Sequence, residues 1–169
     1  MNGYRRRLSK FLGSYLLDGN IFDELLINAE LKRLMLKFSH TGRIKFISTH
    51  VEKDEIDAIP FEKAEKWVQI NLLRDKLRAS YVPVSGFLLD RSKLRESKFI
   101  SHQEMEKLVN SINGNSKYIN DSVLALTAKE NDAILVTNDA KLLKKAISVI
   151  GVRAIDSNTL GEILRNCEI

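Results

Sequence analysis

Four acidic residues stand where short apolar runs give way to turns or helical patterns: Asp18, Glu55, Asp121 and Asp139. Asp18 follows the apolar run 15–17, and Asp139 lies just beyond the run 133–136. Carboxylates brought close together repel and raise one another's pKa values unless a cation lies among them. Mg²⁺ or Mn²⁺ suits oxygen ligands of this kind and keeps waters in its shell. If the fold gathers these acids, they predict a divalent metal site.

The elements that must position these acids alternate between strand-like and helical patterns. Short apolar runs typical of strands lie at 15–17, 44–47, 81–84, 133–136 and 152–155. Apolar residues at helical spacing mark 21–29, 64–77, 121–130, 142–150 and 159–166. Ser48 or Thr49 caps a further expected helix, and Pro83 confines its own strand to an edge position. This alternation predicts right-handed crossovers and a mainly parallel sheet with helices on both faces.

Such a sheet brings the acids to one edge, because every parallel strand ends there and every following helix begins there. Ligands bind at this edge, at the point where the strand order reverses. If the order is 3-2-1-4-5, the strands that end near Asp18 and Asp139 are neighbours at the reversal. Glu55, in the first turns of its helix, and Asp121, which opens the helix leading back to Ala133, are expected at the same edge.

Each acid also has an ordinary structural explanation. Asp121 and Asp139 would serve as helix N-caps, and Asp18 before Gly19 would serve in a turn. Glu55 belongs to an acidic stretch that would suit a solvated helix face, with Glu52, Asp54 and Asp57. The convergence of all four acids on one edge favours a site over four separate structural roles.

Composition sets the bounds on function. The chain has 169 residues, 44% hydrophobic and 29% charged, which suits one globular domain with a core of its own. Its net charge of +5 permits a polyanionic partner. The single cysteine, Cys167, excludes an internal disulfide and a thiolate metal site. The apolar runs are too short to span a bilayer, so no membrane partner is expected and the simplest placement is the cytoplasm.

Basic residues that could hold a nucleic-acid backbone fall in three places: Arg5–Arg7, the segment Arg91–Lys98, and the group Lys141, Lys144 and Lys145. We expect residues 1–13 to form a basic N-terminal arm and 14–169 a single domain. Within 85–118, the pattern indicates a helix over His102–Ile112 and a loop rich in Asn, Gly and Ser.

Four segments between residues 14 and 156 resemble the motifs of PIN-domain nucleases. Leu16–Asn20 is similar to the family's opening, in which an apolar residue precedes Asp-x-Asn. Thr49–Ile56 resembles the helix that carries the family's Glu. Asn120–Ala128 resembles the third motif, an Asp followed by an apolar helix, and Leu135–Asp139 resembles the Thr-x-Asp motif.

The resemblance implies a metal-dependent endoribonuclease with a catalytic and metal-binding set of Asp18, Glu55, Asp121 and Asp139. Asn20 and Thr137 would be supporting polar groups. Either Asp54 or Glu55 could face the metal, and we favour Glu55 because an apolar residue follows it, as in the family. The implied fold is a three-layer α/β/α sandwich with a five-stranded, mainly parallel sheet of order 3-2-1-4-5. Mg²⁺ or Mn²⁺ would be the cofactor and RNA the substrate.

Two other functions compete with this interpretation. A haloacid-dehalogenase-like phosphatase needs a second Asp two residues after its nucleophilic Asp, and Asn20 stands there instead. A non-catalytic PIN-like module would bind RNA or a protein without cleavage. The resemblance also leaves open whether the chain is a toxin bound by an antitoxin or other protein partner, and whether it forms a homodimer.

Overall fold

The computed structural model describes residues 11–85, 97–98 and 119–168. Its main sheet has five strands, all parallel, in the order β3-β2-β1-β6-β7. These strands are β1 (Gly13–Leu17), β2 (Ile44–Ser48), β3 (Ser80–Tyr81), β6 (Ala133–Val136) and β7 (Ala154–Ile155). Numbered along the chain within this sheet, their order is 3-2-1-4-5, so the expected fold is confirmed. The reversal lies between β1 and β6, where Leu17 pairs with Val136.

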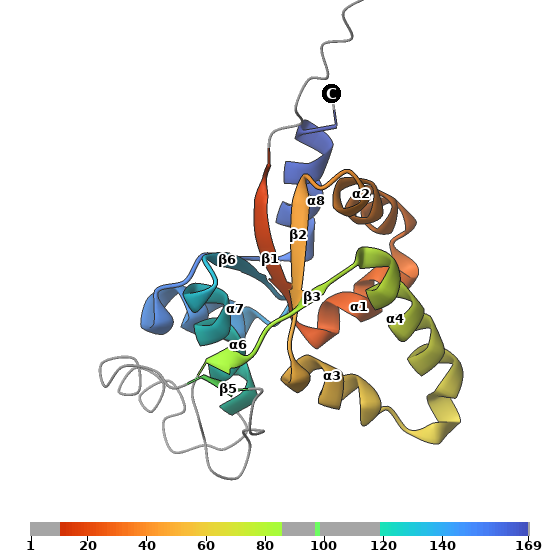
Figure 1. The fold of residues 1–169 in the computed structure, drawn as a ribbon, viewed down its shortest axis with the longest axis horizontal. Coiled ribbons are helices and arrows are strands. Elements are labelled where there is room, and N and C mark those ends of the chain that lie inside the picture. The colour runs from red at the N-terminus through yellow and green to blue at the C-terminus, as the bar shows by residue number, and fades with distance from the viewer. Residues whose placement is uncertain (1–10, 86–96, 99–118, 169) are drawn as a thin grey trace, which may run out of the picture.

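Helices cover both faces of the sheet and make three layers. Figure 1 shows α1 (Gly19–Ile27), α2 (Ala29–His40) and α4 (Ala64–Leu77) on one side, where α8 (Ser157–Asn166) also packs. On the other side lie α6 (Ile119–Glu130), α7 (Ala140–Lys145) and the π-helical turn η3 (Ala146–Ile150). The carboxyl ends of β1 and β2 point toward α1 and toward α3 (His50–Asp57). A 3-10 turn, η1 (Phe61–Lys63), precedes α4.

The core is divided by the sheet, as expected from alternating side-chain directions along a strand. Tyr15 and Leu17 pack into the cluster on the α1, α2, α4 and α8 side. Leu16, between them, packs into the cluster under α6 and η3. Burial on both faces explains why β1 and β6 are continuous apolar runs in the sequence.

Two predicted helices differ in detail from the structure. The segment 21–29 is divided at Asn28, whose side chain accepts a hydrogen bond from the Leu31 amide and begins α2. In α4, Trp67 and Val68 are 40% and 46% exposed. The predicted apolar face is therefore wrong at these positions, because the first turns of α4 lie away from the sheet (Figure 1).

The strand predicted over 81–84 is also divided. Tyr81 ends β3, which is at the edge of the main sheet as predicted. Val84 begins β4 (Val84–Ser85), which pairs with β5 (Ser97–Lys98) in a separate two-stranded sheet. Pro83, between them, has no amide hydrogen to continue a ladder.

The helix predicted over 142–150 is present as α7 and η3, whereas the strand predicted after it is shorter than expected. Leu142, Ala146 and Ile150 are buried, but Ile147 is 53% exposed because the helix widens into η3. Gly151 ends it in the left-handed conformation, with φ 71°. The strand predicted over 152–155 is reduced to β7.

Several predictions lie outside the described residues: the helix over His102–Ile112, most of the basic segment Arg91–Lys98, and the residues Arg5–Arg7. Within the described part of the chain, no helix has the length and apolar character needed to cross a membrane.

Candidate active site

Asp18 stands at the centre of the carboxyl edge, directly after β1. Its amide donates to the Val136 carbonyl at 2.9 Å, which carries the β1–β6 ladder one residue further. Its side chain caps α1, because Oδ1 accepts from the Gly19 amide at 2.8 Å. The residue is 8% exposed. A carboxylate is thereby fixed where the two central strands end.

The two predicted supporting residues both contact this carboxylate. Thr137, after β6, donates from Oγ1 to Asp18 Oδ2 at 2.6 Å. Asn20 donates from Nδ2 to the same oxygen at 2.6 Å, and its own Oδ1 accepts from the Asn138 amide. Burial raises the pKa of Asp18, the hydrogen bonds from Thr137, Gly19 and Asn20 oppose that rise, and the charge of Asp139 adds to it.

Asp139 is the N-cap of α7, as its ordinary explanation predicts. Oδ1 accepts from the amides of Lys141 and Leu142 at 2.7 and 3.1 Å. The Asp139 amide donates to Thr137 Oγ1 at 3.0 Å, so Thr137 links it to Asp18. Capping and membership of the acidic group are therefore compatible at this position.

Glu55 is exposed to solvent, as is Asp54, its neighbour in α3, but the charges of Asp18 and Asp121 act on Glu55. Glu55 Oε2 lies 3.0 Å from the position that a Cβ on Gly19 would occupy. Oε1 accepts from Asn120 Nδ2 at 3.2 Å. Neighbouring protein atoms remove part of its solvation and raise its pKa. Asn120 opposes that rise, and the charges of Asp18 and Asp121 add to it.

Asp121 lies in the first turn of α6 and is half-buried. The sequence predicted it as the residue that opens this helix, but α6 begins at Ile119, so the capping explanation is wrong. Burial raises the pKa of Asp121, followed by the charges of Asp18 and Asp139, while Lys145 opposes the rise.

These four acids, named here the acidic rim, come from four segments and influence one another electrostatically: Asp18, Glu55, Asp121 and Asp139. In the ranges described by the structure, no three acidic, His or Cys side chains are arranged as a ready-made metal site. The donors are all carboxylate oxygens, which fit a hard divalent cation that keeps water between itself and some of its ligands.

The basic residue Lys145 approaches the acidic rim. Lys145, at the end of α7, lies close enough to Asp121 for its charge to oppose the raised pKa of that acid. Burial lowers the pKa of Lys145, and Asp121 counteracts this. Lys141 and Lys144 of the same helix are exposed.

Sequence reasoning missed a buried polar cluster behind the acidic rim. The acidic stretch that includes Glu52 would suit a solvated helix face, yet Glu52 is 1% exposed. Its Oε1 lies 3.3 Å from Arg74 Nε and 3.2 Å from Ser48 Oγ. Burial raises the pKa of Glu52 to about 8, although Arg74 and Ser48 oppose this. Its position four residues before the apolar Ile56, on the same face of the helix, was the available signal.

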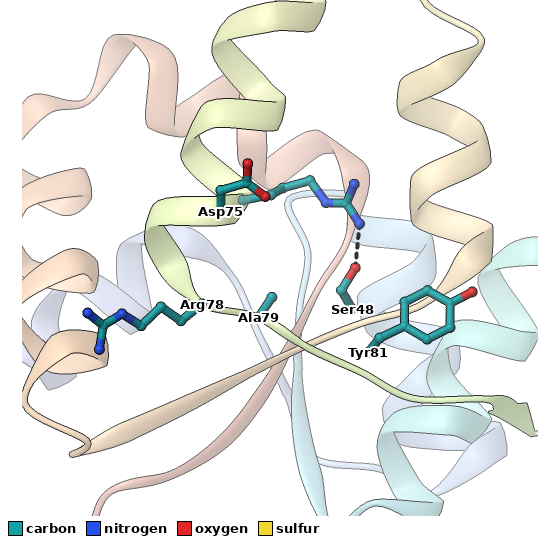
Figure 2. Close-up of a pocket in the computed structure, with 6 residues that line it drawn as sticks. Ser48, Asp75, Arg78, Ala79 and Tyr81 are labelled. Carbon is teal, nitrogen blue, oxygen red and sulfur yellow. Dashed lines mark hydrogen bonds between the residues drawn. The ribbon is translucent and has the colours of Figure 1, made fainter.

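Arg74 and Ser48 also line a cavity of about 270 Å³ between α4 and β3. Figure 2 shows Ser48 accepting a hydrogen bond, which Arg74 Nη2 donates at 2.6 Å. Arg78, on the opposite side of the cavity, is directed away from Ser48 (Figure 2). The cavity therefore does not direct both of its arginines toward one point.

Comparison with known proteins bears on the fold alone. No family model matches the sequence, and no curated protein matches it. The chain is similar to the crystal structure of PAE2754 from Pyrobaculum aerophilum, with a TM-score of 0.52 and 19% sequence identity. The match covers 91% of this chain and 98% of the other. The protein thus shares its α/β fold over nearly its whole length with that structure.

Proposed function

We propose that the protein is a metal-dependent endoribonuclease of the PIN type, which cleaves RNA phosphodiester bonds at the acidic rim. The observation that carries the proposal is the position of Asp18, held by Thr137 and Asn20 where β1 and β6 end. Ligands of parallel α/β sheets bind where the strand order reverses. The other carboxylates of the rim lie nearby: the charge of Asp139 raises the pKa of Asp18, and the charge of Asp18 raises the pKa values of Glu55 and Asp121.

The cofactor fits the chemistry of these residues. Asp18, Glu55 and Asp121 have raised pKa values, so their charged forms are disfavoured without a neutralising partner. A bound Mg²⁺ or Mn²⁺ would supply positive charge beside the phosphodiester and make water more acidic. Carboxylates from all four segments of the acidic rim would hold it.

The residues of the chain have distinct tasks in this proposal. Asp18 and Asp139 provide fixed negative charge, because backbone amides and Thr137 restrain their side chains. Glu55 has fewer restraints and would orient the attacking water. Lys145, beside Asp121, would attract the RNA backbone.

A pair of neighbouring variants tests this function. We expect Glu55→Gln to reduce cleavage of single-stranded RNA by at least about a hundredfold in Mn²⁺, because it removes a charge from the rim. Asp54→Asn removes the same charge from the neighbouring position of the same helix and should keep most of the activity. Gel analysis of assorted RNAs, with and without chelator, measures both.

Two results would count against the proposal. If Glu55→Gln and Asp54→Asn cleave RNA equally well, Glu55 has no special role in the site. RNA binding without metal-dependent cleavage by the wild-type protein would favour the non-catalytic binding module instead.

A further inference from the structure

A cavity of about 260 Å³ opens beside the acidic rim, between α1, α3 and α4. Its lining includes Glu55 of the acidic rim, together with Gly19 and Asn20, which directly follow Asp18. A group bound in this cavity would therefore lie next to the carboxylates proposed to act on the phosphodiester.

We propose that this cavity binds one nucleobase of the RNA, next to the cleaved bond, and that it prefers guanine. The inference rests on the proposed nuclease function and adds a substrate preference to it. Pockets for drug-sized ligands begin at roughly 300 Å³, so a slightly smaller cavity suits a fragment such as a single base.

The wall of the cavity suits the flat face of a base. Ile56, Ile59 and Ile70 supply apolar surface from α3, the turn after it, and α4. Ile56 and Ile70 are 3% and 2% exposed and form the buried floor of the cavity, whereas the half-buried Ile59 offers more of its surface. Unstacked bases of single-stranded RNA are recognised by hydrogen bonds along their edges, which this apolar contact would support.

The polar groups of the cavity define which base edge they would contact. Lys66 Nζ lies 2.6 Å from Asp23 Oδ1, and their side chains are 37% and 54% exposed. An ion pair so open to solvent is weak and leaves further oxygen lone pairs and N–H groups free to bind a ligand. The cavity therefore offers a carboxylate acceptor and an ammonium donor side by side.

Guanine fits this pair better than adenine or uracil does. Its N1–H and N2–H would donate to the Asp23 carboxylate, while its O6 would accept from Lys66. Adenine would present its N1 acceptor toward the carboxylate, and uracil has a single N–H between two carbonyl oxygens. Asp23 and Lys66 are thus specificity residues in this proposal.

Binding of nucleoside 5′-monophosphates tests the cavity without any cleavage, because they contain no phosphodiester bond. Amide chemical shifts would be followed by NMR during titration with GMP, AMP, CMP and UMP, in Mg²⁺ and in chelator. We expect GMP to bind about tenfold more tightly than AMP, within the range for a two-hydrogen-bond contact. The shift changes should centre on Gly19, Asn20 and Ile56.

Two variants and a matched control complete the test. Lys66→Met and Asp23→Asn should remove the preference for GMP, whereas Lys76→Met, on the same helix but lining a different cavity, should keep it. Equal binding of all four nucleotides, or a GMP preference unaffected by Lys66→Met, would overturn the inference. A GMP preference in a protein that cleaves no RNA would refute the nuclease proposal and support the base cavity.

Discussion

Asp18 and Glu55 are restrained to different degrees, and the difference bears on how a cation would be held. Both Asp18 oxygens accept hydrogen bonds of 2.6 to 2.8 Å from groups next to β1 and β6. Glu55 accepts a longer bond, 3.2 Å, from Asn120 on another helix. The acidic rim therefore combines a fixed carboxylate with one that can adjust around a ligand.

Asp121 gives a prediction that separates a metal-binding role from a structural one. Its raised pKa means that the ionised carboxylate destabilises the folded state near neutral pH. Asp121→Asn removes this charge and keeps the size of the side chain. It removes no N-cap, because Asp121 lies inside α6. We expect the variant to lose cleavage, to melt no lower than the wild-type protein in chelator, and to gain less stability from added Mn²⁺.

The pH dependence of the same variant follows from the direction of the shift. As the pH falls toward 3.8, the ordinary value for Asp, the wild-type carboxyl becomes protonated and its penalty disappears. The melting temperature of Asp121→Asn relative to wild type should thus be highest near neutral pH and decrease toward pH 4. A variant that melts well below wild type in chelator and still cleaves RNA would make Asp121 a structural residue.

At the level of elements, Gly19 at the start of α1 leaves room for the Glu55 carboxylate of α3. A Cβ at this position would be 3.0 Å from Glu55 Oε2, so the carboxylate would have to shift by a few tenths of an ångström. The tip of a glutamate moves at little cost, and alanine favours a helix by roughly 0.5–1 kcal/mol over glycine. We expect Gly19→Ala to fold with unchanged or slightly higher stability but to cleave RNA about tenfold more slowly.

Gly161→Ala in α8 is the matched control. A Cβ there would meet Leu31 and Arg165 at 3.6 Å, an ordinary contact distance. It should leave cleavage unchanged. If Gly19→Ala cleaves as fast as Gly161→Ala in single-turnover assays, the position of Glu55 beside Gly19 does not matter for activity.

Arg74 joins α4 to α3 and β2 through the buried Glu52 and Ser48. Arg74→Met leaves Glu52 buried without its positive partner, with an expected loss of unfolding free energy of about 1–3 kcal/mol at pH 7. With a pKa of about 8, Glu52 becomes charged in the wild-type fold as the pH rises through that value and is then stabilised by Arg74. In Arg74→Met no positive charge stabilises the ionised Glu52, so the folded variant keeps this side chain protonated. The loss of unfolding free energy should therefore increase above pH 8, toward roughly 3–5 kcal/mol.

Urea unfolding of Arg74→Met and Arg78→Met at pH 7 and pH 9 measures this effect. Arg78 lies one turn further along, is exposed, and points away from Ser48 (Figure 2), so its variant should differ little from wild type at either pH. A loss for Arg74→Met that stays constant between the two pH values would contradict the assigned titration of Glu52.

Across the whole molecule, the central strands and the strand order of the main sheet could be predicted from the sequence, but the bounds of its edge strands could not. Burial on both faces makes parallel strands continuous apolar runs, and right-handed crossovers restrict their order. The exposure of Trp67 depends on how far α4 extends beyond the sheet, which no local pattern reports. The burial of Glu52 depends on Arg74, 22 residues further along the chain, and spacing within α3 does not reveal that partner.

The proposed function requires that the acidic rim holds a divalent cation and uses it to cleave RNA. The most direct measurement is cleavage of a defined single-stranded RNA by the wild-type protein in Mn²⁺, then in excess chelator, then with Mn²⁺ restored, beside Asp18→Asn under the same conditions. We expect internal cuts that stop with chelator and resume with Mn²⁺, and no cuts by Asp18→Asn in any condition. Cleavage that continues in chelator, or that Asp18→Asn retains, would contradict it.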